Sequence, residues 1–107
     1  MQAAGKLDRR ITIEAPTVSR GTTGGHEETW STHATLWASV RDLSGREIFN
    51  AQAAGSGVSK VVTIRYLSTV TAAMRVRFEN GSTARIAHLR ELGRREMLEI
   101  YCEAVNG

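Results

Sequence analysis

The segment from Trp37 to Glu47 constrains the fold more than any other, because it changes from the pattern of a strand to that of a capped helix. Apolar residues alternate with more polar ones over positions 34–40, which is typical of a half-buried strand. Ser44 and Glu47 then stand three residues apart, ahead of an apolar pair. This is the spacing of a capping box, in which each side chain bonds the other residue's backbone N–H. The segment therefore predicts one short helix, over about residues 45–55, in a chain whose other patterns are those of strands.

Strand patterns cover most of the remaining chain, and six are predicted in all, over residues 10–15, 28–41, 61–66, 74–79, 83–89 and 98–104. Pro16 is expected to end the first of them. Asn80 and Gly81 predict a type I′ hairpin turn, because both central positions of that turn have positive φ. The close spacing of the strands favours a mainly β fold, an antiparallel barrel or sandwich, and a single short α-helix among the strands is typical of a small antiparallel β-barrel. We expect the helix to cover an open edge or to plug one end of the barrel.

Composition limits the class of protein. The 107 residues predict a single domain over 1–107. Twelve arginines and two lysines stand against eleven acidic residues, for a net charge of +3. No run of five cations occurs, so the charge indicates a mixed surface or, as the alternative, a weak stripe facing a polyanion. The single cysteine, Cys102, excludes an internal disulfide, and no apolar run is long enough to span a bilayer. Without a secretory signal, the product is expected to be made in the cytoplasm and not to involve a membrane.

The sequence contains no residue pattern that is typical of catalysis or of cofactor binding. The three histidines, His26, His33 and His88, fit no zinc spacing. No P-loop is present, and no serine stands in a nucleophile elbow. The sequence therefore predicts neither an enzyme nor a protein that holds a metal or cofactor.

Two aromatic residues and one polar segment are candidates for contact with partners. Trp37 falls on the face opposite to Leu36 and Ala38, so either a bulge turns it inward or it anchors a partner. The same two alternatives hold for Tyr101. Residues 17–27 are rich in Thr, Ser and Gly and predict a loop or a mobile hairpin tip.

The chain resembles the head-closure family of long-tailed phages, also called stopper or head–tail adaptor proteins. The resemblance rests on the order and spacing of several motifs over about 100 residues. These are Gly5–Ile13, Trp30, Leu36–Val40, Ser44–Glu47, Ala51–Ala53, Val62–Tyr66, Met74–Val76 and Gly93–Glu103.

The resemblance implies a structural subunit of the virion neck, where a ring of copies, expected to be a dodecamer, lies below the portal and connector. Such a ring closes the DNA channel after packaging and offers a docking face for the tail. The fold that the resemblance implies is a small β-barrel with a short helix and long flexible loops. The implied partners are further copies of the chain, the portal or connector, a tail protein and the genomic double-stranded DNA. An isolated copy can be a monomer that forms its ring only on a template.

Two hypotheses about sites follow from this implied role. The first is an interface with the connector or the tail, formed by the chain ends and by the 17–27 loop, with Arg20, Gly21, Thr22, Thr23, Gly24, Gly25 and His26 as candidates. The second is a surface near DNA phosphates, formed by the helix and the segment after it, with Arg46 and Lys60 as candidates.

Two other functions remain as alternatives. A tail-terminator ring protein has a similar place in phage architecture. A free nucleic-acid-binding barrel of the OB type would stack bases on exposed aromatics, but this chain has only six aromatic residues and no aromatic cluster on one strand face.

Overall fold

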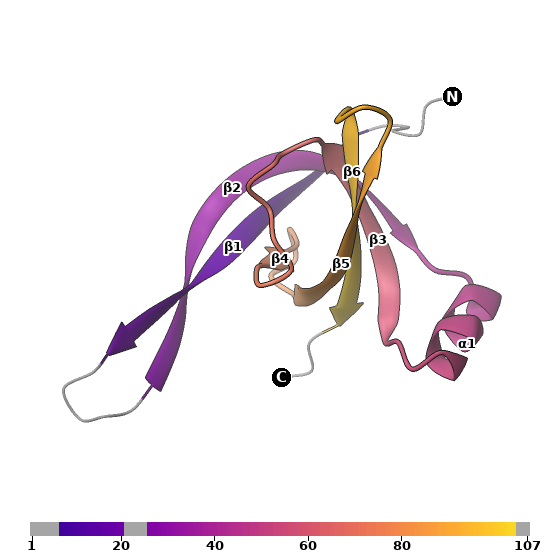
Figure 1. Cartoon of the computed structure of the whole chain (residues 1–107), viewed down its shortest axis with the longest axis horizontal. Coiled ribbons are helices and arrows are strands. Elements are labelled where there is room, and N and C mark those ends of the chain that lie inside the picture. Colours follow the sequence, from indigo (N-terminus) through magenta and orange to yellow (C-terminus); the bar gives the residue numbers. More distant parts are fainter. Residues whose placement is uncertain (1–6, 21–25, 105–107) are drawn as a thin grey trace.

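The computed structural model describes residues 7–20 and 26–104, and six strands and one helix lie in this part of the chain (Figure 1). The elements in chain order are β1 (Arg9–Arg20), β2 (His26–Asp42), α1 (Gly45–Ala53), β3 (Val58–Arg65), β4 (Arg75–Arg77), β5 (Thr83–Leu92) and β6 (Met97–Ala104). The strands form a closed barrel in the order β1-β2-β3-β6-β5-β4. All neighbouring strands are antiparallel, and the pairing of residues 12–14 with residues 75–77 closes the barrel. The predicted mainly β fold is confirmed.

Alternate side chains of the strands fill the barrel. In β6, Leu98, Ile100 and Cys102 are buried and alternate with the half-buried Glu99 and Tyr101. β3 is buried on both faces over residues 61–64. The buried cluster comprises Ile11, Ile13, Ala38, Val62, Ile64, Val70, Val76, Phe78, Ala84, Ile86, Leu98, Ile100 and Cys102. Burial raises the pKa of the Cys102 thiol to about 12. This cysteine therefore stays protonated at neutral pH and packs as a small apolar side chain.

β1 and β2 are longer than the sequence pattern predicts, and the prediction that Pro16 ends the first strand is wrong. Pro16 pairs with Trp30, and the strand continues to Arg20. Pairing with β4 stops at Glu14, so at Pro16 the strand has β2 as its only described neighbour. Proline is tolerated there because its missing N–H need not interrupt a ladder on the open side.

The helix lies outside the barrel. α1 connects the neighbouring strands β2 and β3, packs against β3 and has no buried residue. Figure 1 shows it projecting from the lower right of the barrel. The expectation that it plugs the barrel or covers an open edge is therefore wrong, since a closed barrel filled by its own side chains offers neither place.

The turn between β4 and β5 differs in type from the prediction. Gly81 has φ +88°, but Asn80 is not among the described residues with positive φ. The Gly81 N–H donates to the carbonyl of Phe78, and the Phe78 N–H donates to the carbonyl of Ser82. This is a three-residue loop with a glycine in the left-handed position. Asn80 stabilises it through its side-chain oxygen, which accepts from the backbone N–H of Ser82 at 2.9 Å.

Candidate interaction surfaces

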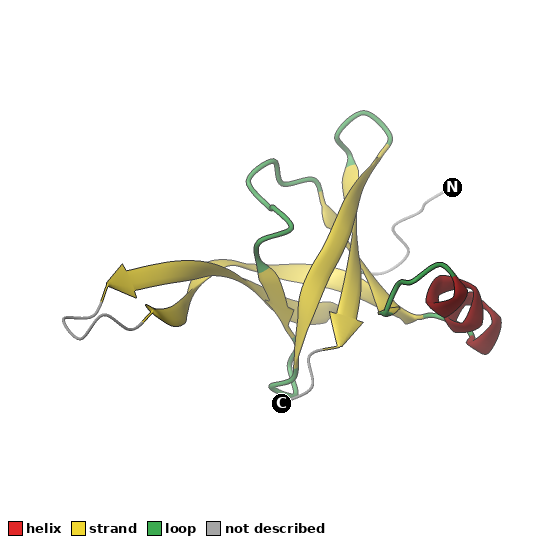
Figure 2. Cartoon of the chain, turned by 60° about the horizontal axis from the view of Figure 1, so that its bottom comes forward, coloured by secondary structure: helices red, strands yellow, loops and turns green. Residues whose placement is uncertain are grey.

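The first candidate surface is the two-stranded ribbon that β1 and β2 form beyond Glu14. Pairing of the two strands continues to Arg20 and His26, past the point where β4 stops. Within the described part of the chain, neither outer edge of the ribbon has a strand neighbour, and such an edge can accept a strand of another chain. Figures 1 and 2 both show the ribbon and α1 projecting from opposite sides of the barrel.

The predicted interface loop corresponds to the tip of this ribbon. The loop expected over residues 17–27 is wrong in its extent, because the strands continue to Arg20 and His26, which form the last described pair. Thr17 donates from its hydroxyl to the carbonyl of Thr29 at 3.0 Å, which holds the two arms together. Threonine favours strands because its branched side chain fits a pleated surface. The other members of the predicted interface, Gly21, Thr22, Thr23, Gly24 and Gly25, lie outside the described residues.

A buried carboxylate fixes the base of the ribbon. Glu14 is 5% exposed and accepts from Arg75 Nε at 2.7 Å and from Arg77 Nη1 at 3.3 Å. The Arg75 guanidinium also lies over the ring of Trp30, 4.3 Å from its centroid. The register of β1 against β2 shifts here, so that β2 has an extra residue, His33. Such a bulge increases the local twist and directs the ribbon away from the barrel.

The helix begins at the predicted capping box. The Glu47 N–H donates to Ser44 Oγ at 3.2 Å, and the Ser44 N–H donates to Glu47 Oε1 at 2.9 Å. Arg41 adds a bond to the same carboxylate, and the backbone N–H of Ser44 together with Arg41 lowers the pKa of Glu47. Phe49 is 70% exposed on this helix. A capped helix that presents a phenylalanine to solvent is a candidate contact surface.

The two residues predicted to lie near DNA differ in their surroundings. Arg46 is exposed in the first turn of α1. Lys60 lies on β3 and donates from Nζ to Asp42 Oδ1, and this bond lowers the pKa of Asp42. Because a carboxylate offsets the charge of Lys60, Arg46 offers the stronger attraction for a phosphate.

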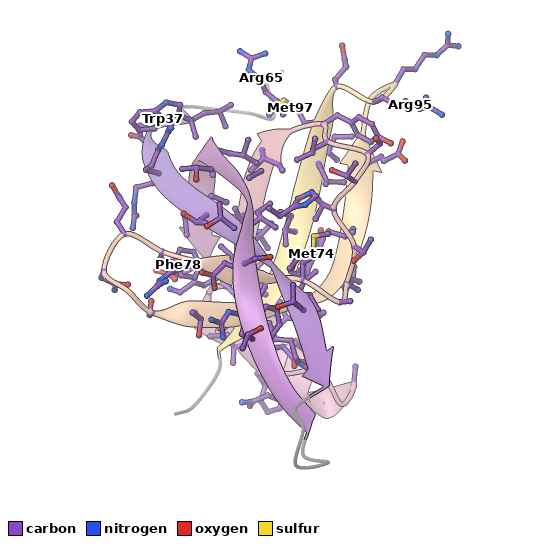
Figure 3. The ribbon with its side chains drawn as sticks, turned by 90° about the vertical axis from the view of Figure 1, so that its left-hand side faces the viewer. Trp37, Arg65, Met74, Phe78, Arg95 and Met97 are labelled. Atoms are coloured by element: carbon purple, nitrogen blue, oxygen red, sulfur yellow. The ribbon has the colours of Figure 1, made fainter. Side chains whose placement is uncertain are left out.

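Trp37 points outward and is 54% exposed, so the alternative in which a bulge turns it inward is wrong. The Arg10 guanidinium lies over its ring, 4.8 Å from the centroid. Beside it is a hollow of about 230 Å³ that is lined by Leu7, Arg10, Thr35, Leu36, Trp37 and Arg65. Figure 3 shows Trp37 and Arg65 at the same end of the barrel as Met97 and Arg95.

Tyr101 is half-buried and has partners within the chain. Its ring stacks on His88 at 4.1 Å between centroids, and its hydroxyl donates to Glu99 Oε1 at 2.8 Å. Burial and the bond to Glu99 raise the pKa of this phenol. A tyrosine with these contacts has less free surface for a partner than Trp37 has.

A second hollow, of about 400 Å³, lies beside the connection between β3 and β4 and is lined by Tyr66, Leu67, Ser68, Val70, Leu89, Glu91 and Leu98. Glu91 is the only charged residue of this lining. Among residues 7–20 and 26–104, no three His, Cys, Asp or Glu side chains are grouped as metal ligands. The described helix is too short and too polar to span a membrane.

Comparison with known proteins identifies the family. A model of phage head completion proteins matches residues 3–105. The chain belongs to the phage head completion protein family. Its fold is similar to the solution structure of protein SF1141 from Shigella flexneri 2a, with a TM-score of 0.77, 30% identity and 96% of each chain covered. It is also similar to a chain of the virion of a native gene transfer agent particle, with a TM-score of 0.60, 19% identity, and 92% and 94% of the two chains covered. No curated protein sequence matches the chain.

Family membership makes this head completion protein a structural component of the virion rather than an enzyme. The resemblance noted in the sequence is thereby confirmed.

Two residues of the candidate surfaces could not be recognised from the sequence pattern. Glu14 follows the alternating pattern of a solvent-facing residue, and only the partners on β4 show that it is buried. Phe49 was not singled out by the sequence pattern, and its 70% exposure follows from a helix that has no buried residue.

Proposed function

We propose that this head completion protein is a head–tail joining subunit that acts as a ring. In this role a dodecamer lies below the portal or connector, closes the DNA channel after packaging and presents the face on which the tail docks. The observation that carries the proposal is the ribbon that projects from the barrel in a member of this family (Figure 2).

The dimensions of the barrel require several copies for any role at a channel. The chain measures 52 × 30 × 26 Å, and apolar side chains fill the interior of the barrel. The described part of one copy contains no passage for a DNA duplex, so a channel has to run between copies. The ring is the simplest closed arrangement of identical subunits around a channel.

Two different projecting elements supply what a ring needs. Contacts in a cyclic assembly of more than two copies are head-to-tail, so each subunit needs two unlike complementary surfaces. The ribbon offers open strand edges on one side of the barrel, and α1 offers the exposed Phe49 on the opposite side (Figure 1). Contact between the ribbon of one copy and the α1 side of the next would place both surfaces in the interface.

Shortening the ribbon tests the proposal. Thr17 and Thr29 are directly paired, so an Asn-Gly turn in place of residues 18–28 can close a shorter hairpin without changing the barrel. We expect the shortened protein to fold, as shown by an unchanged circular dichroism spectrum of the barrel. It should fail to join heads to tails in an in vitro assay scored by electron microscopy, because one of the two complementary surfaces is gone.

A matched variant keeps the full length of the ribbon and replaces only residues 21–25 with glycine and serine. If this variant joins heads to tails and the shortened one does not, the arms of the ribbon make the essential contact. If both fail, the tip makes it. Normal joining by the shortened protein would contradict the proposal.

The proposed role near DNA is tested separately. We expect Arg46→Ala to reduce the amount of DNA retained in tailless heads more than Lys60→Ala does, because Asp42 already offsets the charge of Lys60. Arg90→Ala, which removes an exposed cation from β5, serves as the control and should leave retention unchanged. Equal retention in all three variants would exclude a phosphate contact at these positions.

A further inference from the structure

Unpaired arginines gather at one end of the barrel. The structure describes the side chains of eleven of the twelve arginines, and six of these eleven pair with a glutamate. Five form no ion pair with a described carboxylate. Four of the five lie at one end of the barrel. Figure 3 shows Arg65 and Arg95 there, together with Trp37. Arg10 lies over the Trp37 ring, and Arg94 precedes Arg95 in the turn between β5 and β6. The exposed acidic side chains nearest to these arginines in the sequence are Asp8, Glu91 and Glu96, so four arginines stand against three carboxylates at this end.

The hollow beside Trp37 lies between two of these arginines. We call this surface the Trp37 face and define it by Arg10, Trp37 and Arg65, with Leu7, Thr35 and Leu36 in the hollow between them. Arg10 and Arg65 are exposed, whereas Leu7 and Leu36 are half-buried. The Arg10 guanidinium lies over the Trp37 ring and forms no ion pair with a described carboxylate, so its N–H groups remain available to a carboxylate of a partner.

We propose that the Trp37 face binds an acidic segment of a partner virion protein. Carboxylates of the segment bond Arg10 and Arg65, and an apolar side chain between them enters the hollow against Trp37 and Leu36. The inference rests on the proposed function, because it names the chemistry of one partner at the head–tail joint. Tryptophan and arginine are the residues most enriched among those that dominate the binding energy of protein interfaces.

The hollow favours a protein segment over nucleic acid. A DNA phosphate backbone bonds the arginines through its charge but has no apolar side chain to place between them. A peptide that alternates carboxylates with an apolar residue fills both the charged rim and the hollow. Binding by a peptide should therefore depend on its apolar residue as well as on its charge.

A peptide titration tests this inference on the full-length protein. The probe is a peptide of four glutamates around a central leucine with both ends blocked, and binding is followed by tryptophan fluorescence and calorimetry at low salt. We expect Trp37→Ala and the double variant Arg10→Ala/Arg65→Ala each to weaken binding at least about tenfold. The matched control Arg46→Ala/Arg90→Ala removes the same charge from other surfaces and should change affinity less than about twofold.

Two results would overturn the inference. One is an equal loss of affinity in the control and in Arg10→Ala/Arg65→Ala, which would indicate nonspecific attraction of charge. The other is stronger binding of a DNA duplex than of the peptide, lost in the same variants, which would make the face a nucleic-acid site. A serine in place of the central leucine should weaken peptide binding, and unchanged binding would exclude the hollow as a pocket.

The head–tail joining assay separates this inference from the proposed function. If Arg10→Ala/Arg65→Ala loses peptide binding and also loses joining, both stand. If it loses peptide binding and still joins heads to tails, the acidic partner is excluded and the proposed function is unaffected. Normal joining by the protein with the shortened ribbon would reject the proposed function, whatever the peptide result.

Discussion

Replacing Ile64 with alanine is expected to lower the free energy of unfolding by about 3 kcal/mol. Ile64 has no exposed surface, lies within β3 and pairs with Leu98 of β6. The substitution removes apolar contacts and leaves a cavity. Strand pairing on both sides of β3 holds the barrel wall in place, so the wall cannot move inward to fill the space. Urea denaturation followed by circular dichroism measures the loss.

The same substitution at Ile48 is the matched control. Ile48 is half-buried on α1, outside the barrel, so its truncation removes less buried surface and leaves no closed cavity. We expect Ile48→Ala to cost less than about 1 kcal/mol. Similar losses for the two variants would mean that the helix and the barrel contribute equally to stability, contrary to the packing described above.

The barrel was predictable from the sequence because its signals are local. Strict alternation in Leu98, Ile100 and Cys102 marks a strand with one buried face, and the structure places all three in the core. The capping residues Ser44 and Glu47 mark where the helix begins, because both bonds of the box form between residues three apart. Signals of this kind need no knowledge of the rest of the fold.

The ribbon was not predictable from the sequence. β1 can continue through Pro16 because β4 no longer pairs with it there. A proline within a strand is tolerated only where no second strand pairs with it, and the sequence near Pro16 does not say where β4 ends. The type of the β4–β5 turn is a similar case. Asn80 and Gly81 suit two hairpin turns of different length, and the register of β4 against β5 selects the longer one.

The outward position of Trp37 was one of two alternatives that the sequence left open. Alternation alone places it opposite to Leu36 and Ala38, and a bulge would have reversed that placement. The bulge between β1 and β2 lies beside Glu14, so the register of β2 through Trp37 is regular and the Trp37 ring faces solvent.

Ion pairs were even harder to predict from the sequence than the position of Trp37. The glutamate partners of Arg75 and Arg9 lie more than sixty residues away from them along the chain.

Replacing Glu14 with alanine is expected to lower the free energy of unfolding by about 2 kcal/mol. The side chain of Glu14 is 7% exposed and bonds both Arg75 and Arg77. Its removal leaves Arg75, whose side chain is 25% exposed, partly desolvated and without a counter-charge. The expected loss is below that of a fully buried pair, because Arg77 is half exposed and can turn to solvent.

The control removes a carboxylate from an exposed pair. Glu79 bonds Arg9 at 3.2 Å, and about half of each side chain is exposed. Glu79→Ala is therefore expected to cost less than about 1 kcal/mol. Urea denaturation of both variants gives the comparison, and equal losses would show that burial adds nothing to the Glu14 pair.

Hydrogen exchange shows whether Glu14 fixes the ribbon to the barrel. Residues 15–17 and 29–31 pair only with each other, so their amides depend on the ribbon keeping its place at the bulge. In Glu14→Ala we expect these amides to exchange faster, while amides of β3 and β6 change only as far as the loss of global stability requires. Since Arg75 also lies over Trp30, Arg75→Ala should give the same pattern. A double-mutant cycle between the two substitutions should then show a coupling above about 1 kcal/mol, and additive effects would mean that Glu14 and Arg75 act on the ribbon independently.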